Sequence, residues 1–133
     1  MINTRLSVAI HILALISKDN TLSSEKIASS VNTNPVVIRR IRGQLKKAGI
    51  IDVKRGLSGA SLTRNPIDID LLDIYRAVHI NEELFRVHNN PNPECEVGRN
   101  IQSTLNSTFD EVQAKLENEL KNITLDYVIN KLQ

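Results

Sequence analysis

The stretch "NPVVIRRIRGQLKKAGIIDVKRGLSGASLT", residues 34–63, decides the fold that we predict for this 133-residue chain. Its first two residues are typical of a helix start, because the Asn34 side chain can cap the first turn and Pro35 suits the first helical position. Gly49 directly follows two lysines and an alanine, which is typical of a helix end. We therefore predict a helix over residues 35–48.

The predicted helix has an apolar face and a basic face. At 100° per residue, its apolar side chains gather on one side: Ile38, Ile41, Leu45 and Ala48. The opposite side holds Val36, Arg39, Arg40, Gly43 and Lys47. The glycine costs about 1 kcal/mol of helix propensity relative to alanine. It also allows another surface to approach the basic face closely.

A second helix is predicted just before this one. The segment "TLSSEKIASSV", residues 21–31, indicates a helix with Ser23 or Ser24 as its N-cap, and "NTN", residues 32–34, indicates a turn. Two helices joined by a short polar turn, the second of them basic, are typical of a helix-turn-helix motif over about residues 23–48. Any amphipathic helical hairpin satisfies the same geometry, so the motif needs further support.

The residues after the basic helix predict a β-hairpin. "IIDVKR" and "ASLT" have the alternation of two short strands, and the glycines of "RGLSG" between them suit the positive φ angles of a tight turn. A hairpin over about residues 50–64, directly after a helix-turn-helix, is a wing. The cations near its tip, Lys54 and Arg55, can then reach DNA phosphates or a narrow minor groove. An ordinary solvated hairpin is the alternative.

Further helices complete the predicted DNA-binding domain. Residues 3–17 are apolar nearly all round, which predicts a buried helix. "DIDLLDIYRAVH" predicts a short helix whose packing surface consists of Leu71, Leu72, Ile74, Tyr75 and Val78. We assign residues 1–80 to one winged helix-turn-helix domain. Residues 81–98 are assigned to a connecting segment that ends in the loop "NNPNPECEVG".

The last segment, from about Arg99 to Lys131, is predicted to be one long helix. Its apolar residues, at spacings of 4, 4, 3, 4, 4, 3 and 4, are Ile101, Leu105, Phe109, Val112, Leu116, Leu120, Ile123 and Tyr127. This eleven-residue repeat keeps the stripe nearly straight. A helix of about thirty residues is roughly 45 Å long, too long to be covered by so small a domain. We therefore predict that residues 99–133 form a dimerisation helix, with partial packing on the subunit's own helices as the alternative.

Charge is divided unevenly between the two halves. Residues 1–64 contain 11 lysines and arginines against 3 acidic residues, a balance of +8, whereas residues 65–133 contain 6 against 12, a balance of −6. This asymmetry favours a polyanion as partner of the first half, although a solvated basic face would look the same.

The apolar run over residues 6–16 is too short to span a membrane and lacks a signal-peptide pattern, so we expect a cytoplasmic protein.

Together these segments resemble the Rrf2 family of bacterial transcription regulators. The resemblance lies in "INTRLSVAIHILALIS", "SEKIASSVNTNPVVIRRIRGQLKKAGII", the wing "RGLSGASLTR", "PIDIDLLDIYRAVH" and the long last helix, and so covers essentially the whole chain. Through "RVHNNPNPECEVGRNIQ" the sequence looks most similar to the YwnA-type members. The resemblance implies a homodimeric winged-helix repressor or activator. Some members of the family sense iron–sulfur clusters, nitric oxide or cysteine supply.

The chain departs from the family pattern at two places. The wing is commonly R-G-x-x-G-G-Y, and here Ala60 and Ser61 stand in the last two positions. Members that bind a cluster have three cysteines in the loop before the long helix, and here that loop contains only Cys95. One cysteine per chain cannot supply the usual ligands, so we expect no iron–sulfur cluster and no other cofactor or metal. One cysteine also excludes an intrachain disulfide.

Cys95 is the candidate for a redox or electrophile switch. A thiol near the start of the long helix could form a disulfide with its dimer mate or with a small thiol. Glu94 and Glu96 oppose formation of its thiolate, and a bystander thiol is the alternative. A small ligand near Tyr75, Phe85 and the apolar stripe, or a protein effector, is equally compatible with the sequence.

The predicted function is sequence-specific binding to a pseudo-palindromic site in double-stranded DNA, most simply as a repressor. The expected contacts to base edges or phosphates come from Asn34, Val36, Val37, Arg39, Arg40 and Gly43, with Arg40 able to form two hydrogen bonds to guanine. Lys47, Lys54 and Arg55 would contact the backbone or minor groove, and Thr4, Arg5 and Ser24 would add phosphate contacts near helix starts.

The sequence contains no catalytic triad order, phosphate-binding glycine loop or metal-ligand spacing, so we expect no enzyme. The alternative is a dimeric interaction module with only non-specific affinity for DNA.

Overall fold

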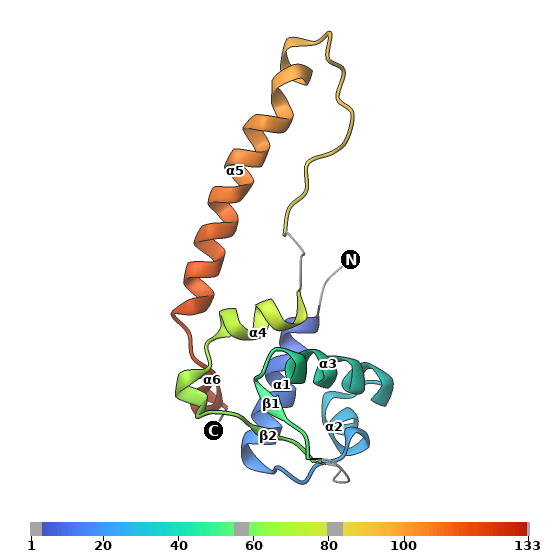
Figure 1. Ribbon diagram of the computed structural model, residues 1–133, viewed down its shortest axis with the longest axis vertical. Coiled ribbons are helices and arrows are strands. Elements are labelled where there is room, and N and C mark those ends of the chain that lie inside the picture. The colour runs from blue at the N-terminus through green and yellow to red at the C-terminus, as the bar shows by residue number, and fades with distance from the viewer. Residues whose placement is uncertain (1–3, 55–58, 80–83, 133) are drawn as a thin grey trace.

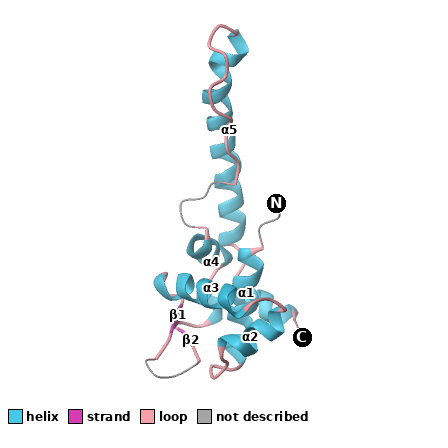
Figure 2. Ribbon diagram, turned by 90° about the vertical axis from the view of Figure 1, so that its right-hand side faces the viewer, coloured by secondary structure: helices cyan, strands magenta, loops and turns pink. Residues whose placement is uncertain are grey.

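The computed structural model describes residues 4–54, 59–79 and 84–132. It is mostly helical with one small antiparallel sheet, as predicted. In chain order the elements are α1 (Arg5–Lys18), α2 (Ser24–Val31), α3 (Pro35–Lys47), β1 (Ile51–Asp52), β2 (Ser61–Leu62), the 3-10 helix η1 (Pro66–Asp68), α4 (Leu71–Val78), α5 (Glu96–Lys121) and α6 (Leu125–Lys131). Figures 1 and 2 show α5 extending away from a body formed by the other elements.

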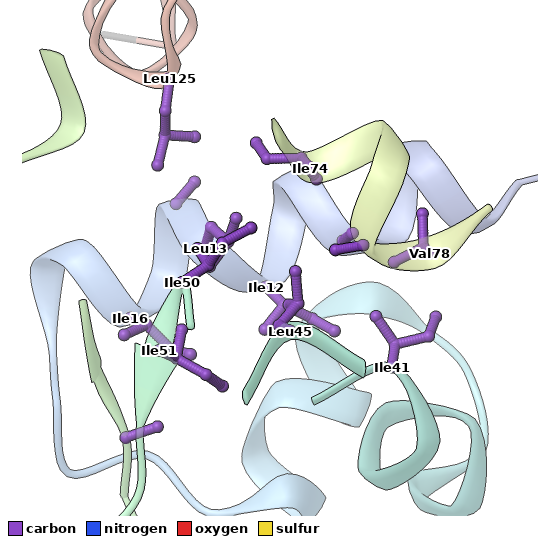
Figure 3. Close-up of a cluster of buried hydrophobic side chains, with 14 of the residues drawn as sticks. Ile12, Leu13, Ile16, Ile41, Leu45, Ile50, Ile51, Ile74, Val78 and Leu125 are labelled. Atoms are coloured by element: carbon purple, nitrogen blue, oxygen red, sulfur yellow. The ribbon is translucent and has the colours of Figure 1, made fainter. Parts of the chain in front are cut away.

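The hydrophobic core lies in this body, where α1 is surrounded by the other helices and the hairpin. Figure 3 shows side chains from α1, α3, β1, α4 and α6 meeting in one cluster. Ile12, Leu13, Leu45, Ile74 and Leu125 of this cluster have no solvent exposure. Full burial of each such side chain contributes about 1.5–3 kcal/mol to folding. The predicted burial of the first helix is confirmed.

Side-chain caps define the starts of α2 and α3 as predicted. The Ser23 hydroxyl accepts a hydrogen bond from the Lys26 amide at 3.2 Å. Asn34 Oδ1 accepts one from the Val36 amide at 2.8 Å, and Pro35 is the first residue of α3. Between the two helices Asn32 has a left-handed conformation with φ 62°, which reverses the chain. These contacts join residues that are close in the sequence, and they define the starts of the two helices and the turn between them.

The end of α3 is formed by a glycine with a positive φ. Gly49 has φ 79°, and its amide donates to the Lys46 carbonyl at 3.0 Å while the Ile50 amide donates to the Leu45 carbonyl at 3.0 Å. This pair of bonds is a Schellman motif, in which a residue with a side chain would be strained at the glycine position. It turns the chain from α3 directly into β1.

The hairpin follows α3 as predicted. β1 and β2 are antiparallel, with Ile51 opposite Leu62 and Asp52 opposite Ser61. The tip of the predicted wing, including Arg55, falls on residues 55–58 and lies outside the described residues.

A glycine is needed at position 59 for a different reason from the positive φ angle that we predicted. Its φ is not in the left-handed region. Instead, a Cβ atom at this position would overlap the backbone carbonyl of Asn20, in the loop after α1. The glycine therefore permits close contact between the base of the hairpin and that loop, rather than a positive φ angle.

The prediction of one continuous helix over residues 99–131 is wrong, because the helix begins three residues earlier and is interrupted after Lys121. α5 begins at Glu96 and ends at Lys121, and α6 is a separate helix capped by Thr124, whose hydroxyl accepts from the Tyr127 amide at 3.0 Å. The break is stabilised by two backbone hydrogen bonds to the residues around the start of α4: Leu125 N donates to Ile69 O at 2.7 Å, and Leu71 N donates to Ile123 O at 2.9 Å. These tertiary contacts attach α6 to the core, which periodicity alone could not reveal.

α5 and the extended segment beside it form an arm, here called the α5 arm (residues 84–121). Figure 1 shows the segment before α5 running along the helix from α4 toward its far end. The rings of Phe85 and Phe109 lie 5.4 Å apart, and Gln102 Nε2 donates to the His88 carbonyl at 3.3 Å. None of the 26 residues of α5, all of which the structure describes, is buried. Within the described ranges, no helix has the length and hydropathy needed to cross a membrane.

Candidate nucleic-acid interface

The outer face of α3 presents the residues that were expected to contact DNA. Arg39, Arg40, Gly43 and Lys47 are exposed, and Val36 is 61% exposed although it is apolar. A Cβ atom added at Gly43 would have nothing within 4 Å. This face is therefore open, basic and free of bulk at its centre, as close approach of another surface requires.

Two of the expected contacts at the start of α3 also have structural roles. Asn34 is exposed, but its Oδ1 atom caps the helix. Only the NH2 group of this side chain is therefore left to contact another molecule. Val37 is half-buried and packs against the core. Both residues lie at the border of the exposed face, whereas Val36 and Arg40 lie within it.

Ser24 is placed where its side chain is already used. It is buried, and its hydroxyl accepts a hydrogen bond from Nη1 of Arg42 at 2.8 Å. A contact of this hydroxyl with a DNA phosphate would compete with that bond. The Ser24 hydroxyl is therefore already engaged within the protein, whereas Glu25 and Lys26 at the start of α2 are exposed.

Thr4 and Arg5 lie at the other end of α1 from the hairpin. Arg5 is half-buried, and its Nη2 atom is 3.4 Å from Nδ1 of His79, the residue that ends α4. Thr4 is exposed and caps α1 without a side-chain hydrogen bond. Figure 1 shows this end of α1 beside α4, whereas the hairpin lies near the other end of α1.

The base of the hairpin continues the basic surface beyond α3. Lys54 is exposed just after β1, and Arg55 lies outside the described residues. After β2, Arg64 donates from Nε to the Asp68 carbonyl at 2.9 Å and from Nη2 to Asp73 Oδ2 at 3.2 Å. The hairpin is therefore attached to α4 at its exit as well as to α3 at its entry.

Arg42 is a positioning residue that the sequence analysis missed. Only 9% of it is exposed, and it connects α3 to the start of α2 through Ser24. Burial lowers the pKa of Arg42, and the carboxylate of Glu25 acts in the opposite direction. The signal was available, because Arg42 stands one turn from Ile38 and Leu45 and so borders the apolar face.

Glu25 and Arg39 form a second link between α2 and α3 that the sequence analysis also missed. Arg39 Nη1 lies 3.2 Å from Glu25 Oε1, and both side chains are more than half exposed. No local pattern predicts this pair, because the two residues are 14 positions apart.

The predicted apolar stripe is divided between two places. Ile101, Leu105, Phe109 and Leu116 are half-buried on the α5 arm, where Val112 is 41% exposed. Leu120 and Ile123 pack against the core of the body, and Tyr127 is 51% exposed on α6 beneath Lys131. The stripe along α5 is therefore incompletely covered within this chain, and Ile123 and Tyr127 are not on that helix.

Cys95 occupies the N-cap position of α5, at the far end of the arm. The thiol is exposed and forms no side-chain cap hydrogen bond. Its backbone amide donates to the Asn92 carbonyl at 3.3 Å. Gly98 allows this turn to pack on the helix, because a Cβ there would overlap the same carbonyl group.

Comparison with known proteins supports a nucleic-acid interface. The Rrf2 family model, described as "Iron-dependent Transcriptional regulator", matches residues 2–131. A Bacillus subtilis (strain 168) protein named as a putative HTH-type transcriptional regulator, YwnA, is 58% identical over 132 residues, which cover 99% of this chain and 99% of that protein. A crystal structure of a putative DNA binding protein is 50% identical, with a TM-score of 0.80 over 94% of this chain and 98% of that chain.

A more distant solved structure agrees in fold. CymR, the global cysteine regulator of Bacillus subtilis, is 20% identical and has a TM-score of 0.67, covering 98% of this chain and 96% of its own. The likeness shows the same arrangement of a winged helix-turn-helix domain and a long C-terminal helix. The fold class expected from the sequence is confirmed.

The described residues do not fit the iron centre that the family description implies. Among them, no group of three or more histidines, cysteines, aspartates or glutamates could hold a metal ion. Cys95 is exposed at the end of the arm, and His79 stacks on Tyr75 in the body at a ring distance of 4.8 Å. No iron-dependent step is therefore part of the function proposed below.

Proposed function

This chain belongs to the Rrf2 family of transcriptional regulators, and we propose that it is a homodimeric repressor that recognises a pseudo-palindromic operator in double-stranded DNA. The observation that supports this most strongly is the open, basic outer face of α3 next to the base of the hairpin. In this proposal the protein acts in the cytoplasm, catalyses no reaction and needs no cofactor.

Each recognition helix α3 would enter a major groove with its outer face toward the bases. A bidentate contact of arginine with guanine discriminates against a wrong base by about 1–3 kcal/mol, and both Arg39 and Arg40 are exposed where such a contact could form. Val36 would contact a thymine methyl group, because its apolar side chain is 61% exposed on the same face. Lys47, Lys54 and Arg55 would contact phosphates, and Thr4 and Arg5 stay as proposed phosphate contacts outside the main cluster.

The α5 arm would supply the dimer interface. A 26-residue helix without a buried residue leaves the apolar side chains of Ile101, Leu105 and Leu116 incompletely covered within one subunit. A two-fold dimer would cover this stripe with the same stripe of a second copy. It would also place two recognition helices at the spacing of two half-sites. Occupancy of the promoter by such a dimer is the simplest mechanism of repression.

We include oxidation of Cys95 as the proposed signal. Peroxide would convert this exposed thiol to a sulfenic acid with release of water, and a second thiol would then form a disulfide with release of another water. A small ligand near Tyr75 and Phe85, or a protein effector, is the alternative source of regulation.

In wild type, we expect peroxide or diamide to weaken operator binding. Cys95→Ser should abolish this response, and an unaltered response in that variant would eliminate Cys95 as the sensor.

Fluorescence anisotropy tests the proposed function. The protein is titrated against the DNA upstream of its own gene and against a scrambled duplex of the same composition. We expect tight binding to the native fragment, with a specificity ratio of about 1,000-fold or more. Equal, weak binding to both duplexes would contradict this assignment of the operator and favour the interaction module with only non-specific DNA affinity.

A further inference from the structure

Glu25 is an unusual residue for the surface that we propose to face DNA. It is one of 3 acidic residues among residues 1–64, which contain 11 lysines and arginines. It lies in the first turn of α2, and its side chain is 67% exposed. A carboxylate near a polyanion reduces affinity for any duplex, so its presence beside α3 needs a compensating role.

Stability does not account for the pair that Glu25 forms with Arg39. The side chains are 54% exposed for Arg39 and 67% for Glu25, and exposed ion pairs of this kind contribute little to folding because water screens them. The position of Glu25 at the start of α2 favours an acid through the helix dipole. That effect does not require the acid to contact a side chain of α3.

The geometry instead restricts the guanidinium of Arg39. Nη1 of Arg39 donates to Oε1 of Glu25 at 3.2 Å. An arginine has five N–H donors in a rigid fork, so one such bond orients the group and leaves most of its donors for another acceptor. An unrestrained arginine loses more rotamer freedom when it binds a base. Among the described residues none forms an ion pair with Arg40, so of these two arginines only Arg39 is restrained by an ion pair.

We propose that Glu25 is a positioning residue that orients the Arg39 guanidinium for a guanine in the major groove, and so increases specificity at a cost in overall DNA affinity. This inference rests on the proposed function and assigns base recognition to a particular arginine. The pair also connects the two helices of the helix-turn-helix motif, so Arg39 is held relative to α2 as well as to its own helix.

The test compares Glu25→Gln with a matched control, Asp52→Asn. Both variants remove one exposed carboxylate from the basic half, and Asp52 is in β1 at the hairpin. Each variant is titrated against the native fragment and the scrambled duplex. We expect both to bind the scrambled duplex more tightly. Only Glu25→Gln should lower the native-to-scrambled ratio, by about 5-fold, which corresponds to roughly 1 kcal/mol at 25 °C.

A double-mutant cycle with Arg39→Gln shows whether Glu25 acts through Arg39. We expect Arg39→Gln to lower the ratio, and Glu25→Gln to lower it no further in that background. An equal loss in both backgrounds would overturn the inference, because Glu25 would then act independently of Arg39. Thermal unfolding should change little in any variant, because the helix dipole and an exposed ion pair each contribute at most about 1 kcal/mol.

The same titrations separate this inference from the proposed function. If wild type binds the two duplexes equally, the proposed function fails and the inference fails with it. If wild type discriminates and Glu25→Gln discriminates equally well, the inference alone is overturned. If Asp52→Asn lowers the native-to-scrambled ratio as much as Glu25→Gln does, the inference is also overturned. The effect would then come from charge removal and not from the position of Arg39.

Discussion

The body of the molecule and the α5 arm differ in how they bury apolar side chains. In the body, α1, α3, α4 and α6 place fully buried residues such as Leu13 and Leu125 in one core. In the arm, a helix of 26 residues buries none of them. The body therefore has a hydrophobic core of its own, whereas the apolar side chains of the arm are the ones that the proposed dimer would cover.

The largest expected effects come from large-to-small substitutions, which compare apolar burial in the body with apolar burial in the arm. Leu13 has no solvent exposure, so Leu13→Ala should lower the free energy of unfolding by about 2–5 kcal/mol at any protein concentration. Leu105 is only half-buried in one subunit, so Leu105→Ala should cost little when the protein is dilute and more when it is concentrated. Urea unfolding at several protein concentrations distinguishes the two variants. A large, concentration-independent loss for Leu105→Ala would mean that the arm needs no partner.

A charge on the apolar stripe should prevent association without unfolding the body. Leu105→Glu would bury a carboxylate in the proposed dimer interface, and we expect the dimer dissociation constant to rise by about 100-fold or more. Ser107→Glu is the matched control, because this exposed residue points to the opposite side of α5. Sedimentation equilibrium gives both constants. Equal effects of the two substitutions would remove Leu105 from the interface.

The assignment of α6 to the body can be tested at its cap. Thr124 accepts a hydrogen bond from the Tyr127 amide at the break between α5 and α6, so Thr124→Ala should cost about 1 kcal/mol of unfolding free energy. Thr108→Ala is the control, because that hydroxyl only donates to the Thr104 carbonyl within α5. Thermal unfolding is the measurement. If Thr124→Ala is as harmless as Thr108→Ala, the cap does not stabilise the body.

The smallest expected effect concerns one phosphate contact. With about five phosphate contacts in each subunit, log K plotted against log salt concentration should have a slope near −9, and Lys54→Ala should make it less steep by about 2 for the dimer. Lys115→Ala, an exposed lysine on α5, should leave the slope unchanged. Anisotropy at several salt concentrations gives both slopes. An unchanged slope for Lys54→Ala would exclude Lys54 from the contact surface.

Local signals in the sequence were sufficient for the elements that position the candidate interface. The caps of Ser23 and Asn34, the turn at Asn32 and the stop at Gly49 all depend on residues within a few positions of one another. The hydrogen bonds that they form are the ones that helix starts and ends require. This is why the bounds of α2 and α3 could be predicted to within a few residues and the position of the hairpin after α3 could be predicted as well.

Contacts between distant segments could not be predicted in this way. The apolar spacing continues past Lys121, but the helix is interrupted where the Leu125 amide donates to the Ile69 carbonyl and the Leu71 amide donates to the Ile123 carbonyl. The hydrogen bond between Arg42 and Ser24 likewise depends on how the two helices cross, as does the pair of Glu25 and Arg39. Each of these joins residues that are far apart in the sequence.

Footprinting on the DNA upstream of the protein's own gene tests the central claim most directly, because it reports specificity and two-fold symmetry together. The account predicts two protected half-sites related by approximate two-fold symmetry, with their centres about 10 base pairs apart or a multiple of that distance. Leu105→Glu should weaken protection of both half-sites together. Protection of a single site, or no protection beyond that of a scrambled fragment, would contradict a dimeric, sequence-specific regulator of that promoter.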